Sequence, residues 1–350
     1  MVNAKSEKAA LNLEKYVHDV LSSIERERER EIISRRFGLF DRKETLEQIG
    51  ELLGITRERV RQLEKSVISK LKTGAENLPH LSEIENVFIE QLSKMGDCSR
   101  ITNFTPYFAK ENTKIDQSRV AFLAELCPKL VVIDEDDYFY HAIGVKAVHD
   151  EKAIKTLVNE IIEVIKKINQ PTTIQKLAKQ TSISNPDQVA ALASVSKQLA
   201  TLNDKWGLIK WPIVNPRNIR DKIYVILKEN GKHMHFNEIA AAIKESDFKR
   251  KNVTTQAIHN ELIKDNRFVL IGRGIYALKE WGYKKGTVSD IISEVLKEAG
   301  EPLHRDEIVK RVLKSRFVKE TTILLNLQGR PQFKRVAKAT YTLDDEAAAK

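Results

Sequence analysis

The sequence predicts a mainly α-helical protein with short β-hairpins, in which a helix-turn-helix is followed by tandem winged-helix domains. Three observations predict this fold. Two helical patterns meet at Gly54 within residues 45–72. Residues 221–239 are repeated at 290–308, and each copy is followed by a predicted hairpin. A chain of 350 residues with 41% hydrophobic content is also long enough for several cores.

Residues 45–72 carry the helix-turn-helix pattern. Apolar residues recur at helical spacing before and after the break at Gly54: Leu46, Ile49, Leu52 and Leu53, then Val60, Leu63, Val67 and Leu71. Thr45 and Gln48 form a capping-box pattern, and Thr56 is placed to cap the second helix. Gly54 lies where the chain turns and a positive φ is expected.

The second helix begins with long polar side chains, and in a helix-turn-helix this end meets base edges in the major groove. Arg57 can pair with guanine, Glu58 can accept from cytosine and Gln62 can pair with adenine. The Thr56 hydroxyl and Arg61 suit phosphates. The alternative is a solvated charged face with internal Glu–Arg pairs. The full predicted DNA-binding set is Thr56, Arg57, Glu58, Arg59, Arg61, Gln62 and Lys65.

Residues 10–75 resemble region 4 of the sigma-70 family of bacterial RNA polymerase sigma factors. Residues 45–72 (TLEQIGELLGITRERVRQLEKSVISKLK) resemble region 4.2, which recognises the −35 promoter element in that family. Residues 26–40 (REREREIISRRFGLF) resemble region 4.1. Ser66 departs from the pattern, because many members carry Lys there, and this removes a backbone contact. An aromatic-rich helix for the melted −10 strand is missing, so the resemblance implies a promoter reader without the parts that open a promoter.

The repeats predict four further domains after the helix-turn-helix of residues 1–78. Two winged-helix-like domains are expected at 79–150 and 151–212, followed by winged helices at 213–283 and 284–350. The expected hairpin strands are 130–133 with 138–141, residues 206 and 209–211, 268–271 with 275–278, and 333–336 with 340–343.

Residues 215–283 resemble the HARE-type helix-turn-helix domain, a family that includes the N-terminal domain of the RNA polymerase delta subunit of Gram-positive bacteria. The matching stretches are NIRDKIYVILKENGKHMHFNEIAAAI and FVLIGRGIYALKEWGY. These residues mostly determine the fold. The resemblance therefore implies architecture and a transcription setting, and it assigns no base-reading residue.

Charge is unevenly distributed in this basic chain, whose formal net charge is +10. Residues 79–150 hold seven Lys and Arg against twelve Asp and Glu, so this segment is not expected to lie on phosphate. Phosphate contacts are instead considered for basic groups in the C-terminal half: Lys249, Arg250, Lys251, Arg273, Arg330, Lys334, Arg335 and Lys338.

Other residues favour a structural interpretation. His233 and His235 resemble half of a metal site, but His304 recurs at the place of His235, which favours a role at the helix start. The 134–137 acidic run is expected to be a solvated turn, and Trp206, Trp211 and Trp281 are expected to pack in small cores. Cys98 and Cys127 are isolated, which predicts neither disulfide nor zinc. No cofactor or metal is expected.

Together these patterns predict a DNA-binding protein and no enzyme, since a phosphate-binding loop, nucleophile elbow and catalytic carboxylate pair are missing. The expected partners are double-stranded DNA and RNA polymerase, through its β flap, with no small-molecule substrate. Without a signal peptide or membrane-spanning stretch, the expected location is the cytoplasm, at the bacterial nucleoid. Two alternatives stay open: a polymerase-binding interaction protein, or a nucleoid- or defence-associated DNA-binding protein without promoter specificity.

Overall fold

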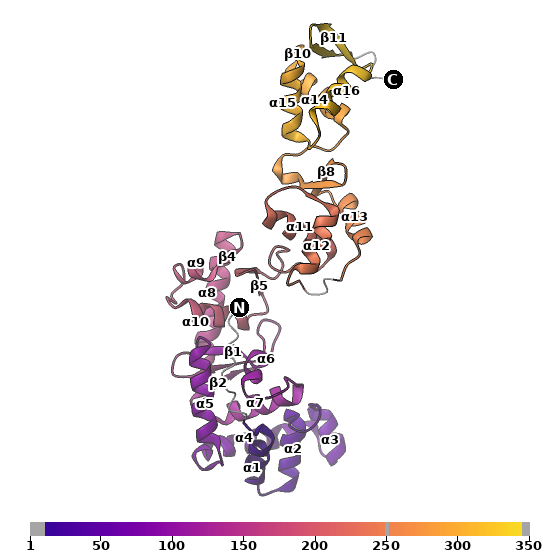
Figure 1. Cartoon of the computed structure of the whole chain (residues 1–350). Helices are drawn as coiled ribbons and strands as arrows, with labels where there is room; N and C mark the ends of the chain where they lie inside the picture. Colours follow the sequence, from indigo (N-terminus) through magenta and orange to yellow (C-terminus); the bar gives the residue numbers. More distant parts are fainter. Residues whose placement is uncertain (1–10, 249–251, 345–350) are drawn as a thin grey trace. The chain divides into compact units, whose positions relative to one another are not determined.

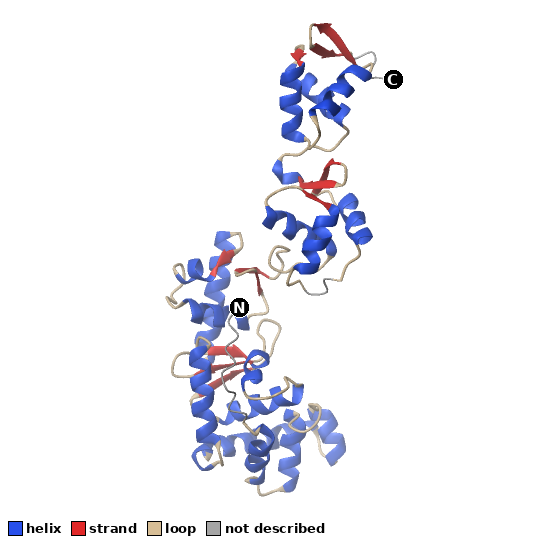
Figure 2. Ribbon diagram, in the orientation of Figure 1, coloured by secondary structure: helices blue, strands red, loops and turns tan. Residues whose placement is uncertain are grey.

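The computed structural model describes residues 11–248 and 252–344. The chain divides into two compact units, Met1–Lys210 and Trp211–Lys350. Figure 1 labels the elements of both units in sequence colours, and Figure 2 shows that helices predominate over short strands. Within the described residues, no helix is long and apolar enough to cross a membrane.

The first unit begins with four helices that contain the helix-turn-helix. Their bounds are α1 Leu13–Ser22, α2 Glu27–Phe37, α3 Leu46–Leu53 and α4 Arg57–Thr73. The predicted capping box is confirmed, since Thr45 accepts from the backbone N–H of Gln48 and the Gln48 side chain accepts from that of Thr45. Thr56 caps α4 by accepting from the Arg59 N–H at 3.2 Å. The start of each helix of the helix-turn-helix is therefore fixed by local hydrogen bonds.

Two glycines allow the tight connection between α3 and α4. Gly54 ends α3 with φ 63°, as predicted, and such a backbone conformation favours glycine. At Gly50 the requirement is close approach, because a Cβ there would lie 2.7 Å from the Ile55 carbonyl oxygen. A side chain at Gly50 would push the start of α4 away from α3, whereas one at Gly54 would strain the backbone of the turn.

The rest of the first unit contains two modules of helices with a small sheet. The first module has 3-10 turns at Ala75–Asn77 and Thr105–Tyr107, and its other elements are α5 Leu81–Lys94, β1 Cys98–Arg100, α6 Ile101–Phe104, α7 Lys114–Leu126, β2 Leu130–Ile133 and β3 Ala142–Val145. The next has α8 Glu151–Ile168, β4 Thr172–Thr173, α9 Ile174–Ala178, α10 Pro186–Val195, β5 Leu199–Leu202 and β6 Lys205–Leu208.

The second unit contains two more modules of the same design. The first comprises α11 Ile219–Asn230, β7 Met234–His235, α12 Phe236–Glu245, α13 Thr255–Lys264, β8 Phe268–Gly272, β9 Ile275–Leu278 and a 3-10 turn at Lys279–Trp281. The second comprises α14 Val288–Ala299, β10 Leu303–His304, α15 Arg305–Ser315, α16 Glu320–Gly329, β11 Phe333–Ala337 and β12 Thr340–Leu343.

All four modules share one sheet topology. Each sheet is antiparallel and three-stranded, and its central strand is the last in sequence: β1-β3-β2, β4-β6-β5, β7-β9-β8 and β10-β12-β11. The first strand of each sheet was not predicted, because a pair of extended residues before a helix shows no periodic pattern. The shared topology extends the repeat seen in the sequence of the last two modules to the two modules before them.

The hairpins of the second unit are confirmed, whereas in the first unit one strand was predicted too early in the chain and one wing too late. The strand expected at 138–141 lies at Ala142–Val145, because Asp136 accepts from the N–H groups of Tyr138 and Phe139 and holds them in a loop. The wing expected at 206–211 pairs β5 with β6 instead. The turn of this hairpin is made by Asn203 and Asp204, which both have positive φ. The helix before the hairpin, α10, ends at Val195.

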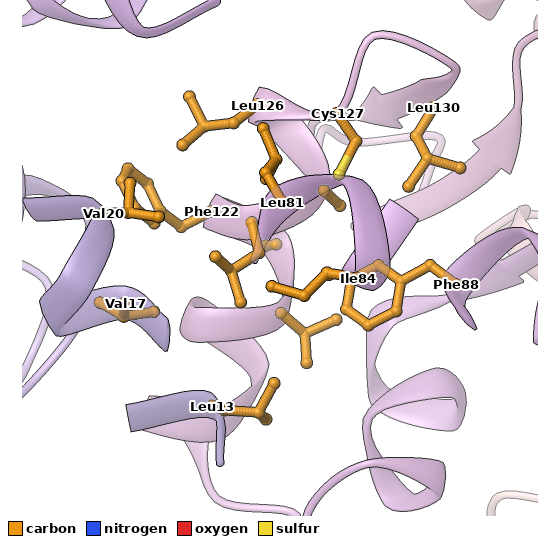
Figure 3. Close-up of a cluster of buried hydrophobic side chains, with 14 of the residues drawn as sticks. Leu13, Val17, Val20, Leu81, Ile84, Phe88, Phe122, Leu126, Cys127 and Leu130 are labelled. Atoms are coloured by element: carbon orange, nitrogen blue, oxygen red, sulfur yellow. The ribbon is translucent and has the colours of Figure 1, made fainter. Parts of the chain in front are cut away.

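One large hydrophobic core joins the helix-turn-helix to the module after it. Side chains of α1, α5 and α7 converge in Figure 3, among them Val17, Ile84 and Phe122, each with no exposed surface. Val67 and Leu71 in the C-terminal half of α4 belong to the same core. The helix-turn-helix itself encloses only a small cluster of Ile32, Ile49 and Val60. Its orientation is therefore set by the neighbouring module.

Candidate nucleic-acid interface

The N-terminal part of α4 presents a continuous exposed polar surface. Every predicted DNA-binding residue on and before this helix is exposed: Thr56, Arg57, Glu58, Arg59, Arg61, Gln62 and Lys65. On the opposite side of the helix Val60 and Val67 are buried, so the apolar stripe fixes which side faces out. The structure therefore brings the predicted set together on one accessible surface.

Side chains on this surface also bind one another. Arg61 donates from Nε to Glu58 Oε2 at 2.9 Å and from Nη2 to Oε1 at 2.6 Å. Gln62 Nε2 lies 3.4 Å from Glu58 Oε1, and Arg59 Nη1 lies 3.5 Å from Gln62 Oε1. The hydrogen bond from Arg61 lowers the pKa of Glu58, and the same bond raises that of Arg61. The internal Glu–Arg pairing considered from the sequence is thus present in the free protein.

Two arginines of α2 hold the helix-turn-helix together. Arg28 donates from Nη2 to the Leu53 carbonyl at the end of α3, at 2.5 Å. Arg36 Nε lies 3.2 Å from Glu64 Oε2 of α4, and both side chains are about three-quarters buried. These contacts use the last-turn carbonyl of α3 and one flank of α4, so the polar side chains of residues 57–59, 61 and 62 stay exposed while Val60 packs in the core.

A cleft of about 1020 Å³ lies along the flank of α4 that carries Arg61 and Lys65. Its other walls are the loop after α2, α7 and the loop between β2 and β3, which contribute residues such as Lys43, Lys114 and Asp134. Glu125, at the end of α7, lines the cleft and also pairs with Lys72 of α4. The cleft therefore lies between α4 and the module behind it.

The basic residues predicted for the second unit lie in several places. Arg273 is exposed in the turn between β8 and β9. Four others are exposed on or beside the hairpin of β11 and β12, and within the described residues none of them forms an ion pair: Arg330, Lys334, Arg335 and Lys338. Lys249, Arg250 and Lys251 lie outside the described residues.

Several residues have the structural roles expected for them. His235 and His304 cap α12 and α15 by accepting from the N–H groups of Asn237 and Asp306. Trp206 is 9% exposed, and Trp281 packs against the cluster of Val269, Ile271 and Ala277. No group of three potential metal ligands is present among the described residues.

A comparison with known proteins finds a family match in the helix-turn-helix. Residues 26–73 match the family described as Sigma-70, region 4. These residues contain α2, α3 and α4, which carry the exposed polar surface. Residues 26–73 are a Sigma-70, region 4 domain. The match ends where the first helix-and-sheet module begins.

Three curated relatives show the extent of the similarity. The RNA polymerase sigma factor sigB of Arabidopsis thaliana is 51% identical over 51 residues, which is 14% of this chain and 9% of the relative. RpoD of Helicobacter pylori is 47% identical over 64 residues, covering 18% and 9%. SigA of Bacillus sp is 44% identical over 61 residues, covering 17% and 16%. The chain thus spans less than a fifth of each relative, and each similarity covers less than a fifth of this chain.

The structure adds residues that the sequence did not single out. Arg42 and Lys43 line the cleft from the loop after α2, and Lys114 lines it from the first turn of α7. The pair in the loop could have been noticed, since it immediately precedes the helix-turn-helix. Nothing in the sequence places Lys114 near α4, because that proximity depends on the shared core.

Proposed function

We propose that this chain is a sigma-factor-like, sequence-specific DNA-binding transcription protein that reads a −35-type promoter element through α4 and contacts RNA polymerase. The exposed polar surface of α4, on a Sigma-70, region 4 domain, carries this proposal. Arg57, Glu58 and Gln62 have the donor and acceptor groups that distinguish guanine, cytosine and adenine in the major groove. The interface is completed by contacts with the DNA backbone beside the helix, and these are proposed for Thr56, Arg59, Arg61 and Lys65.

The polymerase contact is proposed because the matched relatives are RNA polymerase sigma factors. The β flap is the proposed partner surface. One face of the domain is unavailable to it, because α1, the end of α4 and α7 share a buried core. Polymerase would therefore meet the remaining surface of the domain or the modules that follow it.

We further propose that the four modules are winged helices and that the second unit is HARE-like. Three helices with a hairpin, repeated with one sheet topology, support this interpretation. Phosphate contacts are proposed for the exposed hairpin cations Arg273, Lys334, Arg335 and Lys338, together with Arg330. The protein has no enzymatic role in this proposal, and it acts at the bacterial nucleoid.

A second function is supported by the third helix of each of the last three modules, the element that enters the major groove in a DNA-reading domain of this type; α7, the third helix of the first module, differs because it carries Lys114 and Arg119. Among the described residues, α10 and α16 contain neither Lys nor Arg, and α13 contains only Lys264. Instead, Ile263 of α13 is 61% exposed and Leu325 of α16 is 68% exposed. These apolar surfaces suit protein contact, so the modules would serve a polymerase-binding protein without promoter specificity.

Binding of the full chain to matched duplexes tests the two functions. Fluorescence anisotropy would compare a duplex with a −35-type element against a scrambled duplex of the same composition, with and without RNA polymerase. The proposal predicts tighter binding to the −35-type duplex, in the range of 10- to 100-fold. Equal affinity for both duplexes, together with polymerase binding, would establish the second function instead. The full chain is required, because residues 1–78 alone would expose the core they share with α5 and α7.

A further inference from the structure

The cleft beside α4 has an excess of positive charge once its ion pairs are considered. Its charged lining comprises Arg36, Arg42, Lys43, Arg61, Lys65 and Lys114 opposite Asp41, Glu64, Glu125, Asp134 and Glu135. Three of the acids have cationic partners: Glu64 binds Arg36, Glu125 binds Lys72 and Glu135 binds Lys197. Two of those partners, Lys72 and Lys197, lie outside the cleft lining. The acids thus neutralise only one lining cation through these pairs.

Four lining cations form no ion pair within the described residues: Arg42, Lys43, Lys65 and Lys114. All four are exposed. They come from three elements, since Arg42 and Lys43 lie in the loop after α2, Lys65 lies on α4 and Lys114 begins α7. Only Asp41 and Asp134 oppose them without an ion pair of their own, and Asp41 already accepts from the Arg42 backbone N–H at 2.7 Å. Among the described residues, four unpaired cations opposed by two unpaired acids leave an excess of positive charge, which favours a polyanionic ligand.

The cleft lies directly beside the surface that would enter the major groove. Arg61 belongs to both, and Lys65 follows one turn later on the same helix. A helix in the major groove has a sugar-phosphate backbone along each flank. A duplex held by residues 57–62 would therefore carry one of its backbones past the cleft.

We propose that Lys43, Lys65 and Lys114 bind the phosphates of one DNA strand flanking the α4 site, so that the module after the helix-turn-helix forms one wall of the DNA interface. The assignment rests on the proposed DNA-binding function and extends it to a module outside the Sigma-70, region 4 match. Ser118, on the same wall, supplies a neutral hydroxyl donor, whereas the Gln117 amide already donates to Asn112. The acidic total of residues 79–150 does not oppose it, because most of those acids lie away from this wall or have cationic partners.

The shared core makes this wall rigid. Arg119, in the next turn after Lys114, donates from Nε to the Leu39 carbonyl at 2.9 Å and lies 3.2 Å from Glu14 of α1 through Nη2. Lys72 of α4 pairs with Glu125 at the other end of α7. The middle and the C-terminal end of α7 are therefore bound to the helix-turn-helix, and this places Lys114 beside α4 before DNA binds. Such preorganisation lowers the entropic cost of the added contacts.

Salt dependence of DNA binding by the full chain tests the proposal. A phosphate contact contributes a slope of about −0.9 to log K against log salt. Lys114→Gln should lower the magnitude of the slope by about one, and Lys43→Gln with Lys114→Gln by about two. Between 50 and 200 mM salt, the single variant should lose about three- to fourfold less affinity than the wild type. Lys146→Gln, at an exposed lysine of the same module outside the cleft lining, should leave the slope unchanged.

Duplex length provides the second measurement. The wild type should bind a duplex with flanking base pairs more tightly than one cut at the element, and Lys114→Gln should lose most of that gain. An unchanged slope and an unchanged length dependence in Lys114→Gln would overturn the proposal while leaving α4 reading intact. A changed base preference would also overturn it, since phosphate contacts are independent of sequence. Wild-type protein that binds neither duplex would overturn the proposed function itself.

A soluble nucleotide could use the same phosphate-binding chemistry. Thermal unfolding of the full chain with millimolar ATP, in the absence of DNA, distinguishes nucleotide binding from DNA binding. The DNA assignment predicts the same unfolding temperature for wild type with and without ATP. Stabilisation of the wild type that disappears in Lys114→Gln would show a nucleotide site and overturn the assignment to the duplex.

Discussion

Glu58 and Arg61 form a bidentate ion pair on the exposed surface of α4, with N–O distances of 2.9 and 2.6 Å. The pair occupies both carboxylate oxygens that Glu58 would offer to cytosine, and it neutralises the charge that Arg61 would offer to phosphate. Binding to DNA must therefore exchange this internal pair for contacts with the duplex. The free energy needed to break the Glu58–Arg61 pair is the same for every DNA sequence. The free energy gained from the new contacts depends on the base that Glu58 meets.

Glu58→Gln should strengthen binding to scrambled duplexes and reduce sequence preference. The substitution frees Arg61 for phosphate and removes a negative charge from the interface, so affinity for scrambled DNA should rise about threefold to tenfold at low salt. Anisotropy titrations with −35-type and scrambled duplexes would measure both effects. Glu51→Gln changes an exposed carboxylate on α3 and is the matched control. Weaker binding of Glu58→Gln to scrambled DNA would contradict the role of the pair.

Base reading and phosphate binding should separate among the side chains of α4. Arg57→Ala and Gln62→Ala should each reduce discrimination between the two duplexes by roughly 1–3 kcal/mol, because each removes a base-edge contact. Arg61→Ala should weaken binding to both duplexes by the same factor. Competition binding with single-base variants of the element would assign each loss to a position. A uniform loss of affinity in all three variants would refute this division of roles.

Local patterns were enough to predict the helix-turn-helix. Thr45, Gly54 and Thr56 act through hydrogen bonds and backbone conformation within a few residues, and apolar spacing sets the buried side of α4. The features that the sequence did not predict depend on tertiary contacts. Phe139 was placed in a strand of its own hairpin, but it bridges to Ser196 of the next module, and the Tyr140 N–H donates to the Val195 carbonyl. Lys114 reaches the cleft only because α7 packs on the helix-turn-helix. Spacing along one chain cannot reveal either contact.

Arg119→Ala should destabilise the first unit. The Arg119 side chain is 11% exposed, and it donates to the Leu39 carbonyl and pairs with Glu14. Glu14 is 65% exposed, so most of the loss comes from the hydrogen bond to the Leu39 carbonyl, and the free energy of unfolding should fall by about 1.5–3 kcal/mol. Urea unfolding followed by circular dichroism would measure the change. Lys94→Ala breaks the exposed Glu90–Lys94 pair on α5 and should cost less than about 0.5 kcal/mol. Equal losses of unfolding free energy in the two variants would contradict the stabilising role of Arg119.

The two cysteines should resist alkylation while the protein is folded. Burial raises the pKa of Cys98 to about 12 and also raises that of Cys127. Because the thiolate is the reactive form, almost none is present in the folded state at pH 8, whereas an unfolded thiol titrates near about 8.5. Iodoacetamide labelling followed by mass spectrometry should show slow reaction in buffer and rapid reaction in denaturing urea. Fast labelling of Cys98 in the folded protein would contradict its burial.

Arg316→Ala should loosen the connection between the two modules of the second unit. Arg316 is 9% exposed, and its guanidinium donates to the carbonyls of Leu270, in β8, and Gly286, before α14. The adjacent Phe317 N–H donates to the Ile271 carbonyl at 3.0 Å, so residues 316–317 lie along the edge of β8. Removing the guanidinium leaves two carbonyls without these donors, at a cost of about 1–3 kcal/mol for each one that stays buried.

Hydrogen exchange on the full chain would locate the effect of Arg316→Ala. The Phe317 amide and the segment between the modules should exchange faster, while the interiors of α11 and α14 keep their protection. This pattern is expected because Ile223 in α11 and Ile292 in α14 are fully buried within their own modules. Arg311→Ala is the control, since Arg311 pairs with Glu307 on the exposed side of α15, and it should leave Phe317 unchanged. Faster exchange throughout α14 would instead mean that Arg316 stabilises the last module as a whole.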